Sequence, residues 1–306
     1  MPNGTAGDIE VAGSRTFFPG RRAGGTRFVV SSRQILTCAL LALVPVIAAS
    51  PAAAQGKLEA RYTATLSGIP IGEGTWNIDI SDTQYSAAAA GGTTGLLRTF
   101  TGGQGSTSAR GTLQAGRLTS SNYVSTIATS KKTDEIRVTV ANGNVKDFKV
   151  DPPQDADPER VPLTDAHQRG VLDPMTASLM RISGTGDPLS PEACQQTASV
   201  FDGRLRYDLK LAYKRMDKVK ADKGYAGPVV VCAVFFSPVA GYIPSRTAIR
   251  YLAKQQDVEI WLAPIAGTRV LVPFRVQGPT PVGTAVLEAS EFVSVAIPTR
   301  ASVKTQ

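Results

Sequence analysis

Histidine is almost missing from this sequence, and so are the arrangements of reactive side chains that common active sites require. The 306 residues include one histidine, His167, and no G-x-S-x-G motif, so a nucleophilic triad lacks its usual base. Neither a phosphate-binding loop nor a dinucleotide-binding glycine pattern occurs. Metal ligands are not clustered either, since the acids of residues 151–159 are typical of a solvated loop. We therefore expect a non-enzymatic protein without cofactor or metal, in which His167 is a solvated residue at a helix start.

Long apolar runs are also scarce, and the one that exists lies near the N-terminus. Residues 35–49 are apolar, follow several arginines and are closed by Ala52, Ala53 and Ala54. This order is typical of a secretory signal peptide, which we expect to span residues 1–54 with cleavage after Ala54. The alternative is an uncleaved N-terminal anchor. The pattern predicts a periplasmic protein, and a mature chain without a transmembrane segment because no second long apolar run follows.

The excess of positive charge is small for a chain of this length. The formal charge is +8 for the whole sequence. About +5 remains after residue 54, because the removed part holds five arginines and two acids. A scattered charge of this size in an exported chain argues against a nucleic-acid partner.

Cysteine is rare, and two of the three cysteines lie beyond the expected signal peptide. An even pair in an exported chain, here Cys194 and Cys232, predicts one disulfide. Closing a loop of that length stabilises a fold by about 3–4 kcal/mol in the chain-entropy model. The alternatives are two buried free thiols or a redox pair, and the absence of a C-x-x-C motif disfavours the redox pair.

Strand patterning is abundant, and it is clearest at residues 201–213. Apolar side chains from Phe201 to Tyr213 alternate with charged ones, which predicts one long strand with an apolar and a charged face. Residues 228–236 are apolar throughout, which predicts a strand buried on both faces. If the two strands pair, the outer face of the second needs a cover, for which a helix at 173–183 is the candidate.

That helix is the main helical signal in the chain. Asp173 is a suitable N-cap, Pro174 suits the first helical position, and Gly184 follows the end. A loop rich in proline and acids is expected before it at 151–162, and a basic loop after the long strand at 214–224.

The remaining chain predicts further strands separated by turn residues, with Asn142 and Gly143 as the strongest hairpin signal. These strands are expected at residues 58–66, 75–80, 84–92, 112–114, 118–123, 136–140, 145–150, 245–251, 258–262, 269–276 and 285–295. We therefore expect residues 55–306 to form a single mainly β domain of the α+β class. Its large curled antiparallel sheet would be a barrel or half-barrel with one or two short covering helices.

Several sequence blocks resemble the DUF3108 family of bacterial exported, periplasmic proteins of unassigned function. The blocks are residues 68–72, 170–174, Cys194 with 200–209, 225–232 and 238–242. Their order and spacing extend over essentially the whole mature chain. The resemblance implies an exported location and a β-rich fold, and it carries no established activity or site residues.

The charged face of residues 201–213 has two interpretations. Asp202, Arg204, Arg206 and Asp208 alternate in sign, which is typical of a solvent-facing or cross-strand ladder of ion pairs. Alternatively they line the inside of a curled sheet, where the two arginines hold a carboxylate or phosphate headgroup. A glycosidase pair of Asp202 and Asp208 is rejected, because six residues of strand separate them by about 20 Å. The working separations of such pairs are about 5–9.5 Å.

Aromatic side chains at strand spacing either form plain core or line an apolar cavity. They are Trp76, Tyr123, Tyr207, Phe235, Phe236 and Trp261. For a ligand site we select Arg204, Arg206, Tyr207, Trp76 and Trp261.

Our leading hypothesis is an exported, non-enzymatic cell-envelope protein that binds a lipid or another apolar or amphipathic ligand in the concavity of its sheet. The alternative is a module that docks on an envelope protein partner through an open sheet edge or through residues 93–102. A third hypothesis is a hydrolase of envelope polymer that uses His167, Asp202 and Asp208.

Overall fold

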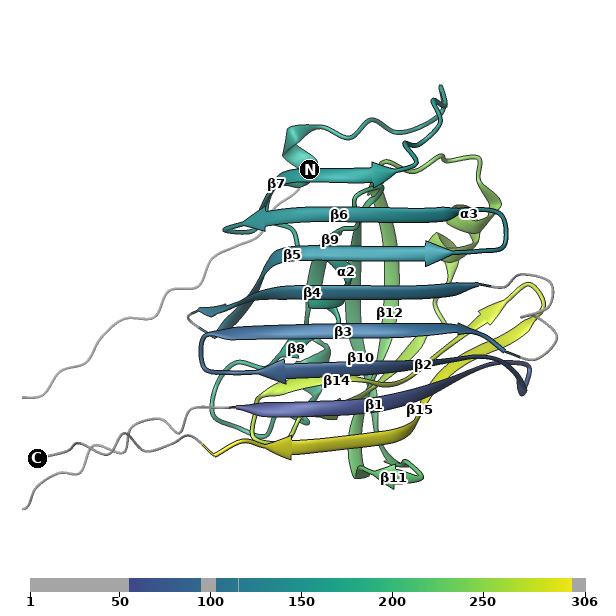
Figure 1. Ribbon diagram of the computed structural model, residues 1–306. Coiled ribbons are helices and arrows are strands. Elements are labelled where there is room, and N and C mark those ends of the chain that lie inside the picture. Colours follow the sequence, from purple (N-terminus) through teal and green to yellow (C-terminus); the bar gives the residue numbers. More distant parts are fainter. Residues whose placement is uncertain (1–54, 95–102, 115, 299–306) are drawn as a thin grey trace, which may run out of the picture. The chain divides into compact units, whose positions relative to one another are not determined.

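The computed structural model describes residues 55–94, 103–114 and 116–298, and the structural statements below concern this part (Figure 1). The expected signal peptide, residues 1–54, and residues 95–102 of the expected docking segment lie outside the described residues. Strands dominate the described part and belong to one sheet. The fold is therefore mainly β, as the alternating sequence pattern predicts.

The sheet follows one long path in which neighbouring strands are antiparallel. The order is β7-β6-β5-β4-β3-β2-β1-β15-β14-β13-β12-β10-β9, with short β11 parallel to β15 and short β8 antiparallel to β14. The bounds are β1 Gly56–Leu66, β2 Ile69–Ile80, β3 Gln84–Thr93, β4 Gln104–Gln114, β5 Arg117–Ala128, β6 Thr133–Ala141, β7 Asn144–Asp151, β8 Met180–Arg181, β9 Thr197–Phe201, β10 Arg206–Lys220, β11 Lys223–Gly224, β12 Ala226–Ala240, β13 Glu259–Pro264, β14 Val270–Thr280 and β15 Gly283–Ala296.

Strands β1 to β7 form a meander of hairpins, as expected from the sequence. Figure 1 shows β2 to β6 side by side in one layer, with β10 and β12 running across behind them. Asn142 and Gly143 join β6 to β7 with φ of 52° and 72°, the left-handed conformation that a type I′ turn requires at both positions. Leu58, Ala60 and Tyr62 alternate with exposed residues in β1, so the period-two pattern places one face of the meander in the core.

The two ends of the sheet path, β7 and β9, approach each other across residues 169–172. The Val171 N–H donates to the Gly143 carbonyl at the tip of the β6–β7 hairpin (2.8 Å), and the Leu172 N–H donates to the Ser199 carbonyl of β9 (2.9 Å). We call this contact line the seam. The sheet is curled, because its two ends approach each other. It is open, because β7 and β9 do not pair directly, and this matches the half-barrel of the sequence prediction.

The expected single strand at 201–213 is wrong, because a tight turn divides it into the end of β9 and the start of β10. Asp202 Oδ1 accepts hydrogen bonds from the N–H groups of Arg204 (2.7 Å) and Leu205 (2.6 Å). Gly203 follows with φ of 93°, which only glycine adopts readily. Apolar and charged residues alternate on both sides of the turn. The sequence pattern therefore resembled one continuous strand, although Asp202 and Gly203 are typical turn residues.

The expected basic loop at 214–224 is also wrong. Strand β10 continues to Lys220 and pairs with β12 along its whole length, with a register shift between Tyr213 and Arg215. The charged side chains of this half are exposed, while β12 supplies a long partner. Pairing therefore overrides the local polarity that predicted a loop.

The expected helix at 173–183 begins where the sequence predicts but ends after one turn. Helix α2 spans Pro174–Ala177 with Asp173 as its N-cap. The chain then enters β8, which pairs with β14. The extent of the helix was therefore wrong, because tertiary pairing takes over the second half of the segment.

Helix α3 spans Thr247–Lys254, so the strand expected at 245–251 is wrong. Ile249 and Leu252 lie three positions apart, which is a helical spacing that the short apolar pattern obscured. Two 3-10 helices, η1 (Asp165–Gln168) and η2 (Pro191–Cys194), lie in the connections. Residues 152–164 form neither helix nor strand, which confirms the loop rich in proline and acids.

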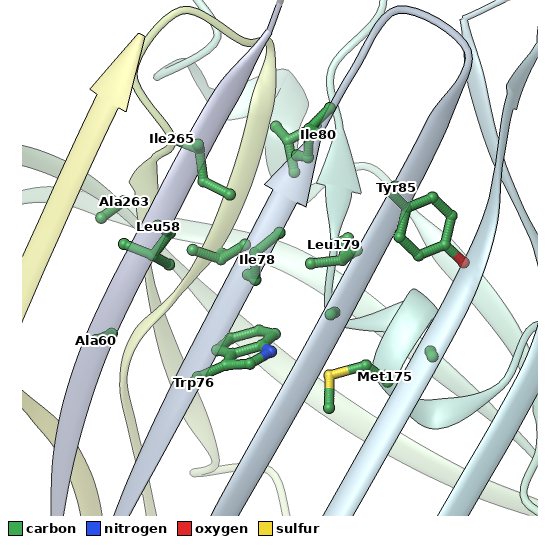
Figure 2. Packing of buried hydrophobic residues seen from close by; sticks show 14 of the residues in the cluster. Leu58, Ala60, Trp76, Ile78, Ile80, Tyr85, Met175, Leu179, Ala263 and Ile265 are labelled. Carbon is green, nitrogen blue, oxygen red and sulfur yellow. The ribbon is translucent and has the colours of Figure 1, made fainter. Parts of the chain in front are cut away.

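The larger apolar core lies between the meander and the strands behind it. Figure 2 shows Leu58, Trp76 and Ile78 of the meander in one cluster with Leu179, which follows α2, and Ile265, which follows β13. Contacts of α2 with β4, β5 and β9 place this helix inside the curl of the sheet. The helix therefore fills the interior between the two layers.

A smaller core lies on the other face of β12 and β13. Val229 and Val231 belong to the larger core, whereas Val230 and Cys232 belong to the smaller one, so this strand is buried on both faces as predicted. The cover consists of residues 180–194, which include β8 and the 3-10 helix η2, instead of the expected helix at 173–183. Cys194 in this cover is joined to Cys232 with a Cα–Cα separation of 5.5 Å, which confirms the expected disulfide.

Candidate functional site

An apolar hollow of about 410 Å³ opens between the meander, α2 and the β14–β15 hairpin. Its lining comes from β1 to β5, from α2 and the residue after it, and from β14 and β15, and none of the lining residues carries a charge. The six largest lining side chains are those of Tyr62, Trp76, Tyr123, Met175, Val276 and Leu287. Three larger depressions, of about 550, 520 and 470 Å³, are lined mainly by small and polar residues and offer no comparable apolar wall.

The alanine-rich sequence of β3 leaves room for the hollow. Trp76 of β2 lies opposite Ala89 of β3, and Thr75 lies opposite Ala90. Both alanines belong to the lining, and Ala89 is the one on the face of the indole ring, because Ala90 is exposed on the opposite face. A methyl group cannot fill the space that a larger apolar side chain would occupy next to tryptophan, so the volume remains open.

Tyr62 forms the wall of the hollow on the β1 side. Its hydroxyl donates a hydrogen bond to the Pro273 carbonyl of β14 at 2.6 Å, which fixes the side chain. Its ring is tilted against that of Trp76 at a centroid distance of 6.4 Å. Burial raises the pKa of Tyr62, so this wall stays uncharged at neutral pH.

Trp76 has a buried donor without a partner. The side chain is 8% exposed, and its Nε1 has no hydrogen-bond acceptor among the described residues. Figure 2 shows the indole nitrogen on the side of the ring that faces Met175, which also lines the hollow. An unpaired buried N–H typically costs about 1–3 kcal/mol, so this donor lowers the stability of the fold.

A buried polar network holds α2 against the meander. Asp173 is fully buried; its Oδ1 accepts the Thr176 N–H at 2.9 Å and its Oδ2 accepts the Thr176 hydroxyl at 2.5 Å. The Tyr85 hydroxyl of β3 shares a short hydrogen bond with the same Thr176 hydroxyl, and Ser120 Oγ of β5 accepts the Asp173 N–H at 3.0 Å. Burial raises the pKa of Asp173. The network presents Met175 to the hollow from a fixed position.

Two of the predicted aromatic residues line the hollow, and they are Trp76 and Tyr123. Burial raises the pKa of Tyr123, which keeps the second phenol of the lining neutral. Tyr207 is half-buried and lies against Phe236 at a ring distance of 5.3 Å, outside the lining. Its pKa is raised by burial first and then by the negative charge of Asp202.

The two predicted arginines are engaged by carboxylates of the protein itself. Arg204 Nη2 lies 3.1 Å from Asp134 Oδ1. Arg206 Nη1 lies 2.8 Å from Asp208 Oδ1, and its Nη2 donates to Ser199 Oγ at 2.7 Å. Neither guanidinium group lines the hollow. The arrangement corresponds to the ion-pair interpretation of this charged face.

Trp261, also selected from the sequence, lies in a separate place. The guanidinium groups of Arg215 and Arg275 lie over its ring, with their Cζ atoms 5.3 and 5.0 Å from the centroid. Its Nε1 donates to Asp217 Oδ2 at 3.0 Å. Trp261 is therefore a buried residue with a satisfied donor, and it does not line the hollow.

Sequence reasoning missed Tyr62, Met175, Val276 and Leu287 of the lining. Tyr62 had a usable signal, because it alternates with polar residues on the inward face of β1. Met175 lies in the segment predicted as a helix, but its neighbours across the interior depend on how the sheet curls. The pairing of Val276 with Leu287 depends on the β14–β15 register.

The three residues of the hydrolase hypothesis, His167, Asp202 and Asp208, form hydrogen bonds with residues close to them in the structure. His167 Nδ1 lies 3.2 Å from both the Thr164 backbone N and its Oγ1, at the start of η1. Asp202 caps its own turn, and Asp208 accepts the Ser199 hydroxyl at 2.8 Å. Over residues 55–94, 103–114 and 116–298, no group of three potential metal ligands is assembled. Over the same ranges, the helices are too short or too polar to cross a membrane.

The fold and the hollow define a class of β-rich proteins in which a curled, open antiparallel sheet surrounds an apolar interior. The chain belongs to the DUF3108 family, a protein family of unknown function, whose model matches residues 61–290. Among solved structures, it is similar to a beta-barrel-like protein of the domain of unknown function DUF1849 from Brucella abortus. That similarity has 10% sequence identity and a TM-score of 0.44, and it covers 79% of this chain and 98% of the other. No curated protein matches the chain.

Proposed function

We propose that this protein is a non-enzymatic protein of the bacterial cell envelope that binds an apolar or amphipathic ligand in the hollow. The observation that supports this function is the uncharged lining, with Tyr62, Trp76 and Tyr123 on the meander side and Met175 on the α2 side. The envelope location rests on the N-terminal sequence pattern of basic residues, apolar run and small residues.

The size and chemistry of the hollow define the ligand class. Small-molecule sites typically have volumes of about 300–1,000 Å³ and mainly apolar walls, and the hollow lies at the small end of that range. No lining residue is charged, so an ionised group of a ligand would find no oppositely charged partner inside the hollow. We therefore propose that a single apolar chain or ring enters the hollow and that any charged headgroup remains at its mouth.

Tryptophan fluorescence provides a direct test, because the chain has two tryptophans and Trp76 alone lines the hollow. In a Trp261→Phe protein, the emission of Trp76 should change on titration with a single-chain fatty acid and saturate at one molecule per protein. Ala89→Phe fills the hollow and should weaken the affinity at least tenfold. Ala88→Phe is the matched control, because Ala88 is the preceding residue on the opposite, exposed face of β3.

Two outcomes would contradict the proposal. One is an emission spectrum that does not respond to single-chain amphiphiles or to neutral apolar probes. The other is equal loss of affinity in the Ala88 and Ala89 variants, which would place the binding elsewhere. Consumption of envelope polymer by the purified protein would favour the hydrolase alternative.

The alternative function is docking on an envelope protein partner through a sheet edge. Residues 169–172 hydrogen-bond to Gly143 and to β9, so they occupy part of both ends of the sheet path. An open edge normally favours strand addition, and this cover reduces the available edge. The ligand-binding function is therefore our first proposal.

A further inference from the structure

Two hairpin tips lie next to each other at one end of the sheet. The β1–β2 and β14–β15 hairpins end on the same side of the sheet (Figure 1). Ile69 is the first residue of β2, and Val282 lies between β14 and β15. The Ser67 N–H of the first tip donates to the Thr284 carbonyl of the second at 2.8 Å. The two tips therefore form one continuous surface, which we call the double tip.

The double tip is apolar, exposed and free of charge. Ile69 is 68% exposed and Val282 is 72% exposed, and these are the two most exposed large apolar side chains of the described chain. Residues 63–72 and 277–287, which form the two tips and their stems, contain no charged side chain. Single exposed apolar residues are ordinary, but two of them on adjacent, uncharged hairpin tips indicate a contact site.

The inner face of the same strands leads from the double tip to the hollow. Leu66 pairs with Ala285, and Ala64 pairs with both Gly72 and Leu287. Leu287 lines the hollow, so small and apolar residues extend from the tips to its wall. An apolar ligand moving along this face would meet no charged side chain of the two stems.

We propose that the double tip inserts into the surface of an uncharged lipid layer and that the hollow exchanges its ligand there. Apolar side chains gain free energy when they move from water into the boundary between headgroups and acyl chains. A protein partner is disfavoured, because protein interfaces are enriched in aromatic side chains and arginine and the double tip contains neither. The exchange step rests on the proposed function, whereas the insertion step does not.

Vesicle flotation tests the insertion step. The purified protein should float with vesicles of phosphatidylcholine alone, and neither added anionic lipid nor high salt should change the bound fraction much. The double variant I69D/V282D should reduce the bound fraction at least tenfold. V295D is the matched control and should float like the wild type, because Val295 is a 50% exposed apolar residue at the far end of β15.

The outcomes separate the two proposals. Failure of the wild type to float, or equal loss in V295D, would overturn the insertion step. Flotation that requires anionic lipid and disappears in salt would also overturn it, since a charged surface would then be responsible. Binding of a fatty acid by Trp76 fluorescence should persist in I69D/V282D, which shows that the variant is folded. If fatty-acid binding is lost in I69D/V282D but not in the wild type, the milder single variants I69S and V282S are used in the flotation experiment instead. Flotation without any fatty-acid binding would leave the double tip intact and overturn the proposed function.

Discussion

Arg204 Nη2 lies 3.1 Å from Asp134 Oδ1, although the two residues are 70 positions apart in the chain. Asp134 belongs to β6 and Arg204 to the turn between β9 and β10, so the ion pair crosses the seam. Lys132 Nζ contacts the other carboxylate oxygen at 2.9 Å. Lys132 first and Arg204 second hold the pKa of Asp134 below its usual range. The pair fixes the β9–β10 turn against the far end of the sheet.

Gly203 in the same turn has no room for a side chain. Its φ is 93°, and a Cβ there would lie 2.5 Å from Ile136 Cγ2 of β6. We expect Gly203→Ala to lower the free energy of unfolding by about 1–3 kcal/mol, because both the backbone and the contact become strained. Gly186→Ala is the control, since nothing lies within 4 Å of its Cβ position and its φ is not in the left-handed region. Urea unfolding that gives equal stabilities for the two variants would contradict this account of the seam.

Asp173 should make the fold less stable as pH rises, whereas a carboxylate in a surface ion pair makes a fold more stable as pH rises. Its folded pKa is raised above the ordinary 3.8, mainly by burial, so the folded state keeps a proton that the unfolded chain has lost. The free energy of unfolding should therefore fall as pH rises from about 4 through the raised pKa. Asp173→Asn keeps the helix cap and should remove this component from urea unfolding curves measured across that range. Asp155→Asn, at an exposed position of the loop, should leave it in place. Parallel pH profiles of wild type and Asp173→Asn would refute the prediction.

The disulfide between Cys194 and Cys232 closes a loop with a sequence separation of 38. Replacing both cysteines by alanine should lower the free energy of unfolding by about 3–4 kcal/mol in the chain-entropy model. Reduction of the wild type should have a similar effect, and a peptide containing both cysteines should appear in mass mapping without reductant. An unchanged urea midpoint after complete reduction would show that residues 180–194 cover the smaller core without needing the bond.

The two tryptophans should respond differently to replacement by phenylalanine. Trp76→Phe removes a buried N–H that has no acceptor, which offsets part of the lost apolar contact. Trp261→Phe removes the hydrogen bond to Asp217 and contacts with two arginines. We expect Trp261→Phe to cost about 1 kcal/mol more free energy of unfolding than Trp76→Phe, a small difference because Asp217 is exposed. Thermal unfolding of both proteins checks the order, and a larger loss for Trp76→Phe would reverse our interpretation of its nitrogen.

The meander could be predicted from the sequence because its pairing is local. Asn142 and Gly143 specify a turn by their own conformational preferences, and Val138 and Val140 before them face inward with period two. The errors arose where distant partners decide the structure. Residues 214–220 are polar enough for a loop, yet β12 holds them as a strand.

The hollow could be predicted in part. Trp76 and Tyr123 carried the expected signal of large aromatic side chains facing inward, and both line it. Arg204 and Arg206 could not be assigned from the sequence, because their partners Asp134 and Ser199 are brought to them by the turn and by the curl of the sheet. The ligand-binding role of Trp76 remains a prediction.

Strand β1 pairs with β2 on one side and with β15 on the other, along its whole length in both cases. One edge of β1, the first described strand, is therefore covered only when β15, the last strand, pairs with it. A chain produced from its N-terminus would expose that edge until more than two hundred further residues have followed. Such long-range closure slows folding and leaves an intermediate with a template for intermolecular strand pairing. The edge of β1 therefore stays open to pairing with other chains until β15 has been made.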